Sequence, residues 1–208
     1  MGRTPVSGSV PSHGLSTLGA VSETERVRWE ARYRDQGRRL TEPTGFVVEA
    51  VSRIEPIGTA LDLAGGAGRN AIWLAAHGWT VTLVDVSPTA LDLASIAAAE
   101  AGVELETQAV DLDDAAPVGG PWDLVVIAHY LNRELLERVA TMVRPGGHLV
   151  VTHPTIHNLE RNERPPKDHL LQPGELPGLL AGLHVVAQFE GWTPEDRHEA
   201  QIVARRPG

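Results

Sequence analysis

The sequence LDLAGGAGRN at residues 61–70 decides the fold of this chain. It begins inside an apolar run at residues 59–63 that has the composition of a buried strand, and it ends where a helix is predicted at residues 69–77. Glycine between the two lets the backbone approach a ligand closely, and the helix N-terminus offers free N–H groups to an anion. The segment therefore predicts a ligand-binding loop between a strand and a helix.

Strands and helices continue to alternate on the C-terminal side of this loop. Ser87-Pro88 is an N-cap followed by a proline that starts a helix, and Gly78 and Gly102 stand where two helices end. Such alternation is typical of a mostly parallel sheet covered on both faces. The sequence predicts an α/β, Rossmann-like three-layer sandwich, whose seven-stranded sheet ends in an antiparallel hairpin. Strands are expected at residues 59–63, 79–84, 103–110, 122–128, 148–152, 183–189 and 201–205, and helices at residues 69–77, 88–101, 133–143 and 175–181.

The flanking segments complete the predicted domain organisation. Residues 1–20 have low hydrophobicity and many turn formers, which indicates a flexible N-terminal arm. Residues 21–208 are expected to form a single domain, in which two helices within residues 21–55 form a lid over the ligand site. Ser22 and Glu25 fit a capping box for the first of these helices. The proline-rich stretch at residues 153–174 is expected to be a binding loop.

Composition restricts the partners and the compartment. The chain of 208 residues contains no cysteine, so it has no disulfide and no thiol nucleophile, and its net charge is −9. A negative chain is poorly suited to the phosphate backbone of a nucleic acid. The sequence lacks the roughly 20-residue apolar run of a membrane helix and the apolar core of a signal peptide. We therefore expect a cytoplasmic protein, a monomer or homodimer, that acts on a small molecule without a nucleic-acid or membrane partner.

Asp62 discriminates between two ligands for the glycine loop. The spacing Gly66-x-Gly68-x-x-Ala71 also satisfies a relaxed dinucleotide-binding pattern, in which the loop would hold a pyrophosphate. A carboxylate at Asp62 would repel a pyrophosphate but suits the amino group and the sulfonium of S-adenosylmethionine. The alternatives are that Asp62 merely caps a loop, or that the chain is a nicotinamide-dependent reductase. A reductase of this kind lacks an obvious Tyr-x-x-x-Lys pair here, since Lys167 is the only lysine.

Two further acids follow predicted strands. Asp85 ends the second strand, 23 residues after Asp62, where a carboxylate can accept hydrogen bonds from both ribose hydroxyls of a nucleoside. Asp111 ends the third strand, where it can accept the adenine amino group while Leu112 packs on the ring. Together with the glycine loop, these acids predict a nucleoside-binding edge of the sheet.

The combined pattern resembles that of class I S-adenosylmethionine-dependent methyltransferases. More narrowly, residues 26–206 are similar to the tellurite-resistance (TehB-like) methyltransferases. The class-level likeness rests on Asp62, Gly66-x-Gly68, Asp85, Asp111, WDLV at residues 122–125 and RPGG at residues 144–147. The narrower likeness rests on Trp29-x-x-x-Tyr33, AGRN at residues 67–70, LNRE at residues 131–134, PGEL at residues 173–176, His198 and ARR at residues 204–206.

The resemblance implies which residues bind S-adenosylmethionine, with S-adenosylhomocysteine as the product. Arg69 and Asn70 are expected to assist with the methionine carboxylate, although a solvent-facing Arg69 is an equal alternative. Gly66 stands where many relatives carry cysteine, and residues 153–169 match nothing that indicates a substrate, so tellurite activity is not carried over. The implied cofactor-binding residues are Trp29, Asp62, Ala64, Gly65, Gly66, Gly68, Arg69, Asn70, Asp85, Val86, Asp111, Leu112 and Ala128.

Methyl transfer places few chemical demands on the protein. A sulfonium already contains a good leaving group, so the protein mainly aligns a nucleophile and excludes water. A base is needed only for an acceptor that arrives protonated, and soft acceptors such as thiol, selenium or tellurium species need none. A non-catalytic S-adenosylmethionine-binding protein is the alternative from another functional class.

The candidate catalytic side chains lie on the predicted lid or close to the ends of strands. Each has a structural alternative: Tyr33 could pack the lid on the core, and Arg133 could pair with Glu137, four residues on. The histidines match no dense ligand motif, so no metal site is predicted. The catalytic candidates are Tyr33, His129, Arg133, His153 and His198.

Overall fold

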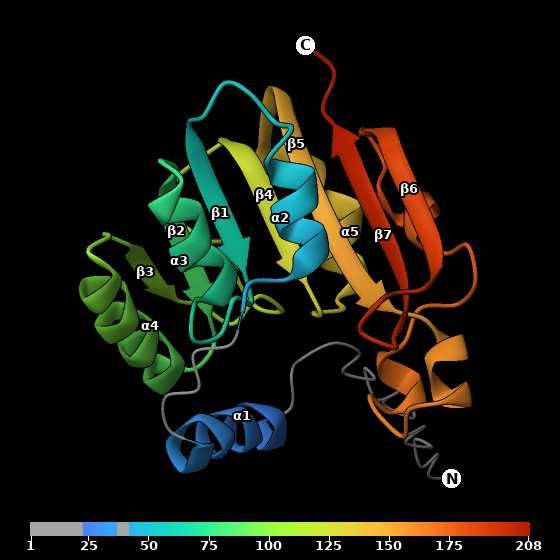
Figure 1. Ribbon diagram of the computed structural model, residues 1–208, viewed down its shortest axis with the longest axis horizontal. Helices are drawn as coiled ribbons and strands as arrows, with labels where there is room; N and C mark the ends of the chain where they lie inside the picture. The colour runs from blue at the N-terminus through green and yellow to red at the C-terminus, as the bar shows by residue number, and fades with distance from the viewer. Residues whose placement is uncertain (1–22, 37–41) are drawn as a thin grey trace, which may run out of the picture.

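The computed structural model describes residues 23–36 and 42–208. These described residues form a seven-stranded sheet in the order β3-β2-β1-β4-β5-β7-β6, which confirms the predicted α/β fold (Figure 1). Neighbouring strands from β3 to β5 are parallel, whereas β7 runs antiparallel to both β5 and β6. The strands are β1 (Thr59–Leu63), β2 (Thr80–Asp85), β3 (Glu106–Ala109), β4 (Trp122–Ala128), β5 (Val143–Pro154), β6 (His184–Trp192) and β7 (His198–Arg205). The α-helices are α1 (Glu23–Gln36), α2 (Gly45–Val51), α3 (Arg69–Ala76), α4 (Pro88–Ala101) and α5 (Arg133–Arg138).

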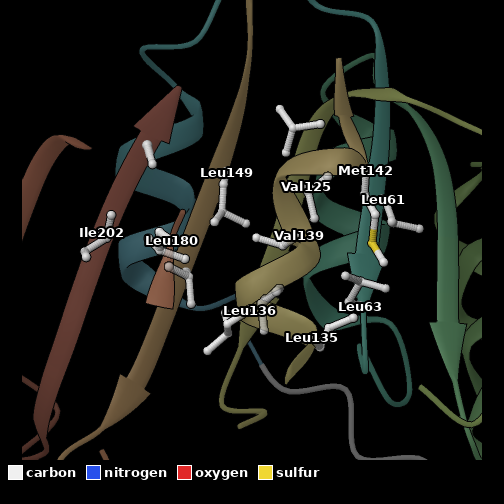
Figure 2. Packing of buried hydrophobic residues seen from close by; sticks show 14 of the residues in the cluster. Leu61, Leu63, Val125, Leu135, Leu136, Val139, Met142, Leu149, Leu180 and Ile202 are labelled. Atoms are coloured by element: carbon white, nitrogen blue, oxygen red, sulfur yellow. The ribbon is translucent and has the colours of Figure 1, made fainter. Parts of the chain in front are cut away.

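Helices cover both faces of the sheet, which gives the predicted three layers. Alternate residues of β4 divide between the two faces, because side chains along a strand point in opposite directions. Leu124 and Val126 belong to the cluster that also holds residues of α2, α3 and α4, whereas Val125 and Ile127 belong to the cluster on the α5 face. Figure 2 shows the second cluster, in which labelled residues of α5 meet residues of β1, β4, β5 and β7.

The predicted helix ends in the central part of the chain are confirmed. Ser87 caps α4 through a hydrogen bond that its side chain accepts from the Ala90 N–H, and Pro88 is the first helical residue. Gly78 and Gly102 follow α3 and α4 with φ angles of 91° and 71°. These left-handed conformations are the ones that glycine adopts most easily at the end of a helix.

The fifth strand begins earlier than predicted, at Val143 instead of His148. Trp122 pairs with Val143 and Leu124 pairs with His148, so the RPGG segment at residues 144–147 forms an irregularity opposite Asp123. A hydrogen bond of 2.8 Å from Arg144 Nη1 to Asp123 Oδ1 holds this segment against β4. The segment is therefore part of the strand and not a turn that precedes it.

The bounds of five other elements also differ from the predictions. The helix expected at residues 133–143 ends at Arg138 and continues as a 3-10 helix, η1 (Val139–Thr141), because the chain then enters the sheet through a bond from the Trp122 N–H to the Met142 carbonyl. The helix expected at residues 175–181 is a 3-10 helix, η4 (Leu176–Leu179). The edge strand β3 is shorter than expected, and both strands of the closing hairpin are longer. Two further 3-10 helices, η2 (Ile156–Glu160) and η3 (Lys167–His169), lie in the predicted binding loop.

The N-terminal predictions are covered only in part. The arm at residues 1–20 and the capping residue Ser22 lie outside the described residues, whereas α1 and α2 correspond to the two predicted lid helices. Among residues 23–36 and 42–208, no helix is long and apolar enough to cross a membrane.

Asp123 joins three segments at the amino end of the sheet and provides a test of the fold. Asp123 Oδ2 accepts hydrogen bonds from the backbone N–H and the side-chain hydroxyl of Thr59, both 2.9 Å long, and Oδ1 accepts from Arg144. Partial burial opposes ionisation, but the bonds from Thr59 and the charge of Arg144 hold the pKa of this carboxyl below its usual range.

We expect Asp123→Ala to lower the free energy of unfolding by about 1–3 kcal/mol at pH 7, because it leaves two partly buried donors of Thr59 without an acceptor. A carboxyl with a lowered folded pKa stabilises above its unfolded pKa and loses this effect as the pH falls through the folded pKa. The difference between wild type and variant should therefore shrink in acid. Urea unfolding at several pH values measures this, with the exposed Asp92→Ala on α4 as the control; a difference that does not depend on pH contradicts the assignment.

Candidate active site

The candidate site lies where the parallel strands end, at the carboxyl edge of the sheet. Asp62 and Asp85 stand at the ends of β1 and β2, and His129 directly follows β4. Figure 1 shows α1 beyond the arrowheads of these strands. This edge is where open α/β sheets bind their ligands, because the loops that follow the strands converge there.

Asp62 is fully buried, and neither of its carboxylate oxygens has a hydrogen-bond partner in the protein. The glycine loop lies directly over the carboxylate, since a Cβ at Gly65 would collide with Asp62 Oδ2. Burial raises the pKa of Asp62 to about 7, against the opposing charge of Arg69. An unpaired buried carboxylate costs free energy, and a cationic ligand group would offset that cost.

The backbone of the glycine loop is tied to the neighbouring strand. Gly66 and Gly68 have φ angles of 58° and 81°, in the left-handed region that other residues rarely adopt. The Gly66 N–H donates a 2.8 Å hydrogen bond to Asp85 Oδ2. A Cβ at Gly66 would collide with the hydroxyl of Tyr33 on α1, so the loop is also where the N-terminal helix meets the core. In this chain the contact with Tyr33 leaves no room for a side chain at position 66.

Asp85 is buried and holds two loops together. Its Oδ2 accepts from Gly66, and its Oδ1 accepts from the Ser87 N–H at 3.0 Å. Burial raises the pKa of this carboxyl, and the bonds from Ser87 and Gly66 oppose the rise. A carboxylate has about four lone-pair sites, so Asp85 can still accept from ribose hydroxyls.

Several other predicted cofactor residues make contacts within the protein. Asp111 Oδ1 accepts from the Asp113 N–H, and Leu112 is buried in the cluster on the α5 face. Asn70 is buried, and its side-chain oxygen accepts from the Thr44 N–H at 2.9 Å, so it holds the start of α2 against α3. Trp29 is half-exposed and stacks beside Tyr33. Their roles in cofactor binding stay predictions, as do those of Ala64, Val86 and Ala128.

His129 forms a hydrogen-bonded chain with Arg69 and Glu199. His129 Nδ1 lies 2.8 Å from Arg69 Nη2, and Nε2 lies 2.8 Å from Glu199 Oε1. A guanidinium can only donate, so Nδ1 accepts and Nε2 carries the proton directed at Glu199. His129 also has a φ angle of 62°, which is uncommon for a residue other than glycine. Arg69 therefore faces His129, against the solvent-facing alternative.

Glu199 is the buried end of this series of hydrogen bonds. Its Oε2 accepts a 2.8 Å bond from the Thr152 hydroxyl, and Arg197 Nη1 lies 3.9 Å from its Oε1. Burial alone would raise the pKa of Glu199, but the hydrogen bonds from His129 and Thr152 lower it to about 2. The group is thus a fixed negative charge that binds His129 and lies near the guanidinium group of Arg197.

The other three catalytic candidates lie on the opposite face of the sheet. His153 and His198 are each adjacent in sequence to a residue of the Glu199–Thr152 pair, so their side chains point the other way. His153 Nε2 lies 2.8 Å from the His169 carbonyl, and burial lowers the pKa of this histidine to about 4. His198 Nδ1 lies 2.7 Å from the Thr155 hydroxyl.

Arg133, like these two histidines, binds the segment at residues 155–175. It pairs with Glu175, at 3.0 Å between Nη2 and Oε2, and also donates to the Leu170 carbonyl. The partner is therefore not Glu137, which the helical spacing suggested. Arg133, His153 and His198 connect the segment at residues 155–175 to the sheet and to α5, and the structure does not bring them to the glycine loop.

The chain is similar to known methyltransferases in sequence and in fold. Residues 60–147 match the family described as "Methyltransferase domain". The chain is 30% identical over 165 residues to glycine N-methyltransferase of Rattus norvegicus, covering 69% of this chain and 56% of that protein. TehB from Haemophilus influenzae has a TM-score of 0.66 at 21% identity, over 86% of this chain and 67% of that chain. A protein described for conversion of a disulfide bond into a thioacetal group during echinomycin biosynthesis has a TM-score of 0.68 at 20% identity, over 86% and 91%.

Residues 60–147 form a methyltransferase domain, and the fold of the chain is that of S-adenosylmethionine-dependent methyltransferases. The fold resembles that of TehB, as the sequence motifs predicted. The chain spans 37% to 60% of the length of the first curated methyltransferases that it matches.

The site residues of this methyltransferase domain fit S-adenosylmethionine. The unpaired carboxylate of Asp62 suits the amino group of the methionine moiety, and the left-handed Gly66 and Gly68 keep the loop free of side chains. Asp85 keeps lone pairs beyond those that bind Gly66 and Ser87, as the predicted ribose contact requires. The charge of Asp62 would repel a pyrophosphate and attract an ammonium group, so the fit favours the adenosyl cofactor over a dinucleotide.

Sequence reasoning missed Glu199 and Arg197. In β7, polar residues at 199 and 201 alternate with apolar residues at 200 and 202, a pattern that is typical of a solvent-facing side. Glu199 is buried instead because His129, 70 residues away in the chain, binds it. A single sequence carries no signal for a pair of this separation.

The raised pKa of Asp62 predicts an unusual pH dependence of stability. In the folded chain Asp62 binds a proton up to about pH 7, whereas the unfolded value is 3.8, so this group makes the protein less stable as the pH rises between these values. Asp62→Asn removes the titration. We expect the variant to gain stability relative to wild type by up to roughly 1.4 kcal/mol per pH unit over this range. Urea unfolding at several pH values, without added ligand, measures this gain. A free-energy difference between wild type and Asp62→Asn that does not change with pH, as expected for the control Asp92→Asn, would refute the assignment.

Proposed function

We propose that this chain transfers the methyl group of S-adenosylmethionine to a small-molecule acceptor held between the glycine loop and His129. The observation that carries this proposal is the buried, unpaired carboxylate of Asp62 beneath a left-handed glycine loop, beside the second buried acid Asp85. This pair suits a ligand that carries both an ammonium group and a ribose. The methyltransferase family match over residues 60–147 supports the same reaction.

Each part of the cofactor has a candidate partner in the chain. Asp62 would accept from the ammonium group, Asp85 from the ribose hydroxyls, and Asp111 from the adenine amino group. Arg69, whose guanidinium points toward His129, would supply the positive charge for the methionine carboxylate. When bound, S-adenosylmethionine supplies an electrophilic methyl group on a sulfonium.

On the acceptor side of the site, neither Tyr33 nor His129 is a free base at neutral pH. Burial and the charge of Asp85 raise the pKa of Tyr33 to about 12, so its hydroxyl stays protonated. The two nitrogens of His129 are engaged by Arg69 and Glu199. These residues therefore align and enclose the acceptor, and they do not remove a proton from it.

A site without a free base favours an acceptor that already carries an available electron pair. Thiolates, selenides and reduced tellurium species have this property. They are soft nucleophiles, and their protonated forms lose the proton at neutral to mildly alkaline pH or below. The guanidinium groups of Arg69 and Arg197 would favour the anionic form of such an acceptor. The likeness to TehB, and to a protein that converts a disulfide bond into a thioacetal group, supports sulfur-like acceptors.

We also propose that the partner is a small molecule and not a nucleic acid or a membrane. The net charge of −9 supports this, since nucleic-acid backbones and anionic lipid surfaces attract basic proteins. The protein would act as a monomer or homodimer. His153, His198 and Arg133 would shape the loop beside the acceptor and would not contact the reacting atoms.

The proposal is tested by incubating the full chain with methyl-labelled S-adenosylmethionine and a panel of an alkyl thiol, selenide, tellurite with a thiol reductant, and glycine. Methylated sulfur, selenium or tellurium products are expected. Binding of S-adenosylhomocysteine without any methylated product would instead favour the non-catalytic alternative, and methylation of glycine alone would contradict the soft-nucleophile assignment.

The role of His129 is tested by the pH dependence of kcat/KM for the thiol. Without a protein base, the rate should follow ionisation of the thiol, and His129→Asn should cost less than about tenfold above the thiol pKa. Tyr33→Phe should leave the inflection where it is. A loss of 10²–10⁴-fold in His129→Asn that alkaline pH does not restore would identify His129 as a general base and overturn this mechanism.

A further inference from the structure

Helix α1 lies over the glycine loop but is not held there by a buried apolar face. Val27 is 56% exposed and Trp29 is 40% exposed, and even Glu30 and Tyr33 are only partly buried. Most helices on a protein surface dock through an apolar stripe. Polar contacts must therefore carry much of the attachment of α1.

The principal polar contact of α1 is made by Glu30, which binds two hydroxyl groups at the start of α4. Ser87 Oγ donates a 2.5 Å hydrogen bond to Glu30 Oε2, and the hydroxyl of Thr89 donates to Oε1. Both carboxylate oxygens are thus bound by hydroxyl groups at the N-terminus of a 14-residue helix, where the helix dipole also favours negative charge. The two bonds hold the pKa of Glu30 below its usual value.

The same contact reaches the cofactor edge through Ser87. The Ser87 N–H donates to Asp85 Oδ1, and Ser87 Oγ donates to Glu30 while it accepts from the Ala90 N–H. Three residues after Glu30, on the same side of α1, Tyr33 lies against Gly66. Glu30 therefore fixes the helix at one point, and Tyr33 covers the glycine loop at the next turn.

We propose that Glu30 is a positioning residue that clasps α1 over the cofactor site and slows release of the adenosyl ligand. Because Ser87 binds both Asp85 and Glu30, occupation of Asp85 by a ligand and docking of α1 reinforce each other. The inference rests on the proposed cofactor site but does not depend on methyl transfer or on the identity of the acceptor.

The test compares Glu30→Gln with wild type in two measurements on the full chain. Glutamine keeps the shape but removes the charge and one acceptor, so amide hydrogens of α1 should exchange about tenfold faster or more, and S-adenosylhomocysteine should dissociate about tenfold faster in stopped flow. Thr89→Val removes one of the same bonds from the α4 side and should act in the same direction. The double variant should be less than additive, because both changes remove one interaction.

Glu49→Gln on α2 is the matched control, since Glu49 is an exposed acid paired with Arg53 one turn away. It should change neither measurement. Exchange in α1 and ligand dissociation that are unchanged in Glu30→Gln would overturn the clasp. If wild type binds no S-adenosylhomocysteine, the proposed function fails, and the exchange of α1 amides in Glu30→Gln still tests the contact itself.

Discussion

The carboxylate of Asp85 is the interaction on which the site depends. Its two oxygens bind the Gly66 N–H and the Ser87 N–H, so one buried group joins the loop after β1 to the turn after β2. Through Ser87 the network continues to Glu30 on α1. The residue that we expect to bind ribose thus also joins the two loops between which the ribose would lie. A change at Asp85 would alter loop structure and ligand affinity together, and Asp62 is the cleaner position at which to separate the two.

The site is divided by charge. On the β1 and β2 side, Asp62 and Asp85 are buried acids, which suits the cationic and hydroxyl-bearing parts of an adenosyl cofactor. On the β4 and β7 side, Arg69 and Arg197 flank His129, and Glu199 neutralises only part of their charge. A positive sulfonium and an anionic acceptor would each meet a side chain of opposite charge. Because the acids and the guanidinium groups lie on different sides of the site, the acceptor would lie opposite the acids.

Much of the fold could be predicted from the sequence because local signals determine it. The strand at Thr59–Leu63 and the cap at Ser87 follow from apolar runs, glycine and N-cap chemistry within a few residues. The start of β5 could not be predicted, because the pair between Arg144 and Asp123 joins two strands and turns an apparent loop into part of the sheet. Two of the resemblance motifs, WDLV and RPGG, meet at this contact and are structural.

The site, like the fold, could be predicted from the sequence only where local signals determine it. The glycine loop, Asp62 and Asp85 are placed by the strands that they follow, so their meeting at one edge could be expected. Glu199, by contrast, is buried by a partner on another strand, and Arg133 finds Glu175, 42 residues away, instead of its helical neighbour. Adjacent residues on a strand point to opposite faces, and this separates His198 from Glu199 although both lie at the same end of β7.

The central claim is that the edge formed by Asp62, Gly66 and Asp85 binds an adenosyl cofactor. Thermal unfolding of the full chain with S-adenosylmethionine, S-adenosylhomocysteine, NADH and NADPH, each added separately, tests it most directly. A ligand at 100 times its dissociation constant adds about 2.7 kcal/mol of stability, which shifts the midpoint by several degrees in a domain of this size. We predict that both adenosyl compounds raise the midpoint and that neither nicotinamide does. A shift with a nicotinamide alone would contradict the assignment of Asp62 and make a reductase the better description.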